Sequence, residues 1–167
     1  MADEHEHESE PAAATAAQTA AIALDARLAL VCVDDAARQE SMKATLTELG
    51  YMPEVPSSAD NALDRMRKSA YQVVVVDELF DGATPLDNAV LKGLTGLTMS
   101  VRRYIFATLI GKSVPTLDNA TAFSRSVNAV FSYGDLDQLA PMLQRAITDN
   151  DAFYRVFREV LKAAGKR

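Results

Sequence analysis

The sequence predicts a doubly wound α/β fold, in which helices cover both faces of a five-stranded parallel sheet. Five apolar runs alternate with helical patterns along residues 27–148. The four consecutive valines at 73–76 are typical of a strand that is buried on both faces. Right-handed crossovers leave few ways to wind such a chain. We expect the strand order 2-1-3-4-5, which places the first and third strands side by side where the winding reverses.

The first half of the sheet comes from three apolar runs. Residues 28–33 (LALVCV) form the first predicted strand. The following helix carries apolar residues one turn apart and ends at Gly50. Residues 51–56 (YMPEVP) predict a short second strand, whose two prolines suit the edge of the sheet. Ser57 or Ser58 can cap the next helix, and residues 72–77 (QVVVVD) form the third strand.

The second half continues the alternation. Asp87 is the expected cap of a helix that runs to Leu97. A fourth strand, a helix, a fifth strand and a final helix are then expected at residues 104–110, 116–127, 129–133 and from about 136. Pro141 is compatible with that helix only within its first turn.

Residues 1–26 predict a disordered acidic and Ala-rich leader before the folded domain at 27–148. Residues 1–10 hold five acids and no Lys or Arg, and the leader contains no aromatic side chain to bury. His5 and His7 lie in this leader and form a weak metal site at best. Because residues 1–10 account for −5 of the net charge of −6, the rest of the chain sums to −1.

Residues 149–167 predict an amphipathic helical extension. The expected apolar stripe of this segment consists of Phe153, Val156 or Phe157, Val160 and Leu161. The extension either continues the fifth helix or forms a sixth. The stripe either packs on the domain or serves a homodimer or a protein partner.

Composition excludes several classes of protein. No apolar run approaches the roughly 20 residues of a membrane span, so we expect no membrane insertion. The nearly neutral body has no basic stripe for nucleic acid. Cys32 is the only cysteine, which excludes an intrachain disulfide and favours a cytoplasmic protein. The only histidines lie in the leader, so the body lacks a histidine base for a serine or cysteine nucleophile.

Carboxylates follow two strands that the predicted order makes neighbours. Asp34 and Asp35 follow the first strand, and Asp77 ends the third. Ligands of open α/β sheets bind at this edge, so the three acids form a candidate site. The acid pair can instead simply cap the next helix.

These residues resemble the receiver domain of two-component response regulators, a CheY-like and flavodoxin-like fold. The resemblance rests on LALVCVDD, TELGYMPEVPSSADNALDRM and VVVVDELFDG, and it covers about residues 27–148. It implies that Asp34 and Asp35 hold Mg²⁺ and that Asp77 accepts a phosphoryl group. The carbonyl of Leu79 would complete the magnesium ligands, and Thr108 would bind the phosphoryl group.

The later motifs depart from that family. Its strand-5 lysine falls at Tyr133, and its aromatic switch residue falls at Val130. Asp81 stands where the family has a proline. The nearest lysine is Lys112, which would have to fold back to reach the site.

These departures favour a signal-transduction protein-interaction module over an enzyme. On this interpretation the chain is an atypical or pseudo-receiver domain that binds a partner protein through the fourth helix, fifth strand and fifth helix. The alternative is a phosphorylatable single-domain response regulator of a phosphorelay, with phosphoryl on Asp77 and Mg²⁺. A dehalogenase-type phosphatase would need an acid at Leu79, and a P-loop would need glycine at Phe106.

Overall fold

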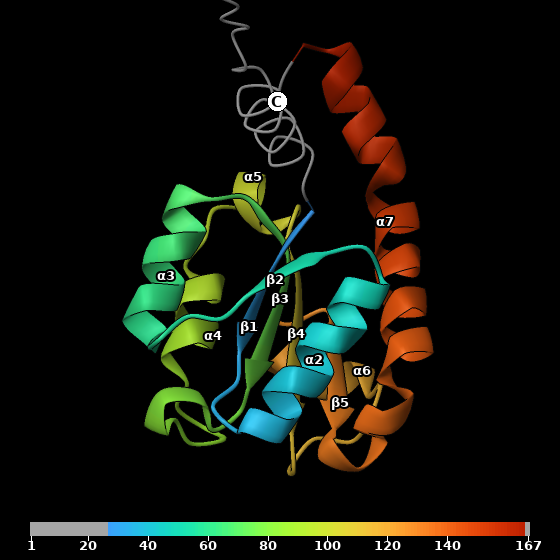
Figure 1. Cartoon of the computed structure of the whole chain (residues 1–167). Coiled ribbons are helices and arrows are strands. Elements are labelled where there is room, and N and C mark those ends of the chain that lie inside the picture. The colour runs from blue at the N-terminus through green and yellow to red at the C-terminus, as the bar shows by residue number, and fades with distance from the viewer. Residues whose placement is uncertain (1–26, 166–167) are drawn as a thin grey trace, which may run out of the picture.

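The computed structural model describes residues 27–165, so the predictions for the leader lie outside the described residues. Five strands form one parallel sheet in the order β2-β1-β3-β4-β5, which confirms the predicted fold (Figure 1). The strands are β1 (Leu28–Cys32), β2 (Met52–Glu54), β3 (Tyr71–Asp77), β4 (Phe106–Gly111) and β5 (Ala129–Ser132). The α-helices are α2 (Ala36–Glu48), α3 (Ala59–Lys68), α4 (Ala89–Thr95), α5 (Met99–Arg102), α6 (Asn119–Ser124) and α7 (Leu139–Ala163). Two 3₁₀ turns, η1 (Phe80–Gly82) and η2 (Tyr133–Gln138), follow β3 and β5.

The sheet is buried on both faces because its central strands are apolar at successive positions. Val73 and Val75 face one side, where α2 and α7 pack on the sheet. Val74 and Val76 face the other, against α3, α4 and α6. Successive strand residues point to opposite faces, so an uninterrupted valine run supplies both cores at once.

Helix caps explain where the helices begin and correct one expectation. Ser58 accepts a hydrogen bond from the Asn61 N–H and begins α3. The cap of α4 is Asn88 and not the expected Asp87. The Asn88 side chain accepts hydrogen bonds from the N–H groups of Val90 and Leu91. The helix is also shorter than expected and stops at Thr95.

The connections also differ from the sequence expectation in length. Helix α6 begins at the Asp118 cap and covers only six residues of the expected 116–127. The short helix α5 was not predicted. The second strand is short and lies at the sheet edge, as its prolines indicated.

The final helix is continuous. Helix α7 runs for 25 residues without a break, so the extension continues the fifth helix of the pattern. Pro141 lies in its first turn, where a missing N–H costs nothing. Its buried residues are Leu139, Leu143 and Ile147, so the second half runs past the core. No helix among residues 27–165 combines the length and the hydropathy needed to cross a bilayer.

Two phenylalanines near the β5 edge provide a test of the packing. Phe131 is fully buried and Phe123 is 86% exposed. We expect Phe131→Ala to lower the free energy of unfolding by about 3–5 kcal/mol, because it leaves a cavity in the core. Phe123→Ala should change it by less than about 0.5 kcal/mol. Urea denaturation of both variants checks this, and equal losses would contradict the packing described.

Candidate functional site

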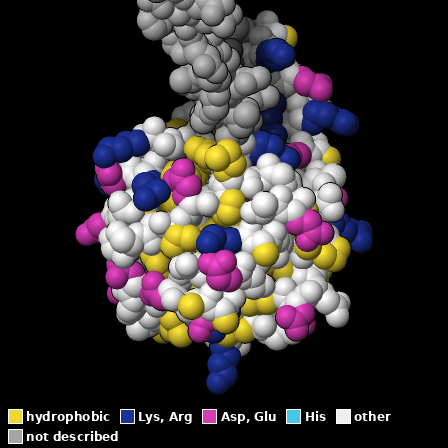
Figure 2. Space-filling model, in the orientation of Figure 1, with side chains coloured by type: hydrophobic (Ala, Val, Ile, Leu, Met, Phe, Trp, Pro, Cys, Tyr) yellow, Lys and Arg dark blue, Asp and Glu magenta, His cyan; other side chains and the backbone are white. Residues whose placement is uncertain are grey.

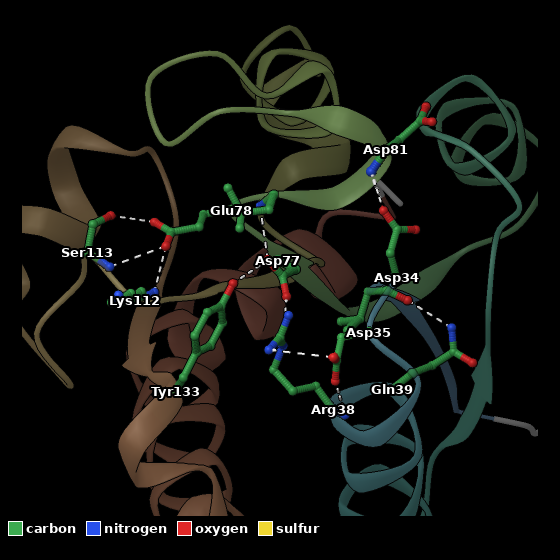
Figure 3. A network of polar contacts seen from close by, with 12 residues as sticks. Asp34, Asp35, Arg38, Gln39, Asp77, Glu78, Asp81, Lys112, Ser113 and Tyr133 are labelled. Atoms are coloured by element: carbon green, nitrogen blue, oxygen red, sulfur yellow. Dashed lines mark hydrogen bonds and ion pairs between the residues drawn. The ribbon is translucent and has the colours of Figure 1, made fainter.

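The site is built around Asp77, the last residue of β3, which is only 2% exposed. Both of its carboxylate oxygens are engaged (Figure 3). Arg38 Nε lies 3.2 Å from Oδ2. The Tyr133 hydroxyl donates to Oδ1 at 2.6 Å, and the Leu79 N–H donates to the same oxygen at 2.9 Å. The buried charge therefore has one cationic and two neutral donors.

Arg38 reaches Asp77 because the first turn of α2 starts at the acid pair. Asp35 is the N-cap of α2, and its carboxylate accepts from the Arg38 N–H at 2.9 Å. The Arg38 guanidinium lies 3.9 Å from the same carboxylate and 4.2 Å from the centre of the Tyr133 ring. A flat guanidinium can make an ion pair in its plane and stack on an aromatic face at the same time. Of the roles considered for Asp35 in the sequence, the geometry supports that of a helix cap.

Asp34 holds the loop after β3. Its Oδ2 accepts from the Asp81 N–H at 2.7 Å. The Asp81 carboxylate in turn accepts from the Ala59 N–H at the start of α3, at 2.8 Å. Asp81 has a φ of 55°, which proline cannot adopt, and proline would also lack the donating N–H. Asp81 thus connects β1, this loop and α3 at a position where a proline could not.

Glu78 is a second buried acid in the site. It is 3% exposed, and its carboxylate accepts from the Lys112 N–H at 2.6 Å and the Ser113 N–H at 3.2 Å. The Ser113 hydroxyl also donates to it. A Cβ at Gly111 would lie 2.4 Å from the Glu78 carboxyl carbon, so only glycine lets the carboxylate approach this loop. Glu78 thereby fixes the loop after β4 beside Asp77.

The proposed magnesium ligands are not brought together. Within residues 27–165 no three His, Cys, Asp or Glu side chains form a group that could hold a metal ion. Asp34 and Asp35 bind backbone N–H groups, and the Arg38 guanidinium occupies the cation position beside Asp77. Leu79 contributes its N–H to Asp77. A divalent cation at this place would face a positive guanidinium, so the residues in this arrangement do not fit Mg²⁺.

The predicted phosphoryl-binding positions are only partly assembled. Thr108 pairs with Val75, two residues before Asp77, and its hydroxyl donates to the Ala129 carbonyl at 3.1 Å. Val130 is fully buried in the core. Tyr133 alone reaches Asp77. Lys112 contacts the site through its backbone N–H to Glu78, and its side chain is exposed.

Sequence reasoning missed Arg38 and Glu78. Arg38 follows the acid pair by three residues, in the first turn of a helix that starts at the site edge. A side chain at that position can reach the end of the neighbouring strand β3. A basic residue there could therefore have been predicted to pair with Asp77. Glu78 directly follows Asp77, and no residue near it in the sequence identifies the groups that donate hydrogen bonds to its carboxylate. Its donors come from residues 112 and 113, and the register that brings them close is not apparent from the sequence.

The environment of Tyr133 favours its neutral form. Burial raises the pKa of Tyr133 well above its ordinary value, and its hydrogen bond to the Asp77 carboxylate raises it further. Arg38 acts in the opposite direction. The phenol therefore stays protonated and donates to Asp77 across the neutral pH range.

Comparisons with known proteins identify the fold. No protein-family model matches the sequence, and no curated protein matches it. The structure is similar to NtrX of Brucella abortus at 19% identity and a TM-score of 0.60, over 85% of this chain. This chain spans only 30% of that NtrX chain.

Two further solved structures are matched over nearly their whole length. A CheY-like receiver domain of Methylobacillus flagellatus has 22% identity and a TM-score of 0.55, with 72% of this chain and 98% of that chain covered. An orphan response regulator of H. pylori has 14% identity and a TM-score of 0.54, with 72% and 95% covered. The chain therefore has the response regulator receiver fold, which confirms the resemblance inferred from its motifs.

Removal of Arg38 tests whether it neutralises Asp77. We expect Arg38→Ala to lower the free energy of unfolding by about 3 kcal/mol, because breaking a buried ion pair leaves an uncompensated charge. Adding Asp77→Asn should recover part of that loss. Lys43→Ala is the matched control, since the Lys43–Glu40 pair is exposed and should contribute less than about 0.5 kcal/mol. A double-mutant cycle showing no coupling between Arg38 and Asp77 would contradict the pairing.

Tyr133→Phe tests the second donor through pH. At neutral pH we expect a loss of roughly 1.5 kcal/mol, the lower value for a hydrogen bond to a charged group. Because the folded-state pKa is raised, the stability from the phenol is fully present below about pH 10 and is lost as the pH rises further. The wild type should therefore lose stability more steeply than Tyr133→Phe above that pH. Urea denaturation along an alkaline pH series measures this difference, and parallel curves would oppose it.

Proposed function

We propose that this chain is a cytoplasmic signal-transduction module of the pseudo-receiver type, which acts by binding a partner protein and not by catalysis. The observation that carries the proposal is the closed arrangement of Arg38, Asp77 and Tyr133. In this arrangement the charge of Asp77 is already balanced by Arg38, without a metal ion or a phosphoryl group.

The closed arrangement opposes phosphoryl transfer to Asp77. An incoming phosphoryl group needs a free carboxylate oxygen and neutralisation of its own charge. Here one oxygen accepts from Arg38 and the other from Tyr133 and Leu79. Transfer would first require one of these donors to leave a carboxylate that is nearly inaccessible to solvent. The loop positions that a switch would move are also fixed, since Glu78 and Asp34 hold them through backbone N–H groups.

A surface for a protein partner lies beside the edge strand β5. A groove of about 1100 Å³ runs between α6 and α7, and its lining includes Leu117, Ala122, Met142 and Phe153. Leu117 is 47% exposed and Phe153 is 77% exposed. We call this surface the α6–α7 groove. It lies on the helix–strand–helix face that the sequence analysis assigns to a partner, and exposed apolar side chains of this kind favour a protein occupant. A second copy of the chain, bound through the α7 stripe, is one such occupant.

The second candidate is a phosphorylatable single-domain response regulator. It is favoured by the position of Asp77 at the carboxyl end of β3, directly between the ends of β1 and β4. Receiver domains generally bind Mg²⁺ at their phosphorylation site. In this candidate Arg38 would swing away, and Asp34, Asp35 and Asp77 would then receive the metal.

An NMR titration separates the two candidates. The ¹⁵N-labelled full chain is titrated with Mg²⁺ and then with beryllofluoride, a mimic of the phosphoryl group. We expect no saturable shifts for the wild type at millimolar Mg²⁺, because Arg38 already neutralises Asp77. Arg38→Ala removes the guanidinium from Asp77 and Asp35 and should gain Mg²⁺-dependent shifts near these two residues, which shows that the method can detect binding.

The opposite result has a distinct pattern. Saturable shifts in the wild type that start at Asp77 and spread to Ala122 and Met142 in the α6–α7 groove would establish a phosphorylatable regulator. Asp77→Asn, which cannot form an acyl phosphate, serves as the control for site specificity. It should abolish those shifts if they come from the acid site.

A further inference from the structure

The second half of α7 projects beyond the domain (Figure 1). Twenty-five residues of α-helix span about 37 Å, whereas the strands beneath have at most seven residues. Ile147 is the last buried residue of the helix. We call residues 148–163 the projecting segment. It needs contacts other than the core to fix its position.

One side of the projecting segment is attached to the domain by arginines. Arg158 donates to the Arg103 carbonyl at 3.4 Å and lies 5.5 Å from the centre of the Tyr104 ring. Arg103, at the end of α5, lies 4.5 Å from the centre of the Phe157 ring. These contacts use the side of the helix that faces α5 and the start of β4.

Another side of the segment is basic. A shallow hollow of about 470 Å³ on this side is lined by Arg155, Arg158 and Lys162, together with Thr148, Asp151, Ala152 and Glu159. Arg155 and Lys162 are exposed. Figure 2 shows Lys and Arg side chains over this end of the molecule. We call this the basic face of α7. It holds three cations against two acids, and one of the acids, Asp151, is already paired with Arg158.

The chain enters the domain next to this face. Arg27, the first residue that the structure describes, lines a cavity of about 440 Å³ together with Asp151 and Arg158. Residues 1–26 are therefore attached beside the projecting segment. Their first ten residues carry Asp3 and four glutamates and no Lys or Arg.

We infer that the acidic residues 1–10 bind the basic face of α7 within the same molecule. Residues 11–26 separate this acidic stretch from Arg27. A random-coil chain of this length has a typical end-to-end distance of roughly 20–25 Å. The projecting segment has a similar length of roughly 24 Å. A tether that matches the span gives an effective concentration on the order of millimolar. Weak surface ion pairs suffice at that concentration.

Charge favours this occupant over a second copy. Two basic faces brought together would oppose Arg155 and Lys162 of one molecule to the same residues of the other. The acidic stretch has the complementary sign and is always present at the site. The apolar stripe with Phe153 and Val160 lies on the opposite side of the helix and stays available to a partner.

The bound acidic stretch would act as a built-in competitor. It covers the basic face against other anionic ligands, such as an acidic peptide. An anionic partner must displace it, which raises the affinity that the partner needs. The interaction should weaken with salt, because the Debye length falls from about 10 Å at 0.1 M to about 3 Å at 1 M.

Paramagnetic relaxation in the full-length chain tests the inference. A nitroxide is attached to Ser9→Cys in ¹⁵N-labelled protein. Cys32 can stay, because it is fully buried and burial raises the pKa of its thiol. We expect loss of amide peak intensity along residues 151–162 at low salt, recovery at about 1 M salt, and no comparable loss in α2. Unchanged α7 intensities at low salt would overturn the inference.

Two controls make the result specific. Arg155→Glu should restore the α7 intensities, whereas Arg145→Glu, the same charge change at an exposed α7 position outside the basic face, should not. Equal effects of the two variants would contradict a site on this face. In a mixture of ¹⁵N-labelled chain without nitroxide and unlabelled chain with nitroxide, we expect no intensity loss. Intensity loss in that mixture would show that the acidic stretch binds α7 of a second copy, which would overturn the intramolecular contact.

Discussion

A carboxylate that is shielded from water has to be neutralised, and the neutralisation of Asp77 determines the arrangement of the elements around it. Arg38 comes from α2, Tyr133 from the start of η2, and the Leu79 N–H from the loop after β3. The Asp77 carbonyl accepts from the Asn88 side chain, which caps α4. Four segments therefore have their positions set by one residue. Removal of Arg38 would leave a buried charge uncompensated, and removal of a neutral donor would leave an acceptor oxygen without its hydrogen bond.

The other acids of this edge have a structural role that uses backbone donors. Asp34, Asp35, Glu78 and Asp81 each accept from at least one main-chain N–H. Such N–H groups in loops and at helix starts have no partner within their own element. Carboxylates satisfy them with strong, charge-assisted hydrogen bonds. The acidic side chains of this edge thus connect its loops and helices.

The fold was predictable because it depends on patterns that the chain shows locally. The valine run before Asp77 and the regular alternation of strands and helices fixed the sheet and its order. Asp87 and Asn88 were not distinguishable as caps, since both side chains can accept from the same helix start. The position of Thr108 was misjudged because the register between β3 and β4, which pairs Asp77 with Ile110, is set by the packed sheet. Arg38 was missed because its partner lies 39 residues away in the sequence.

Helix α7 also has a mechanical consequence. It begins six residues after Tyr133, and it continues without a break from the α6–α7 groove to its projecting end. A helix of about 37 Å behaves as a stiff lever on this scale. A tilt of about 10° at its first turn would displace the far end by roughly 6 Å. A small rearrangement at the carboxyl edge of the sheet would therefore be amplified at the opposite end of the molecule, next to the residue where the described chain begins.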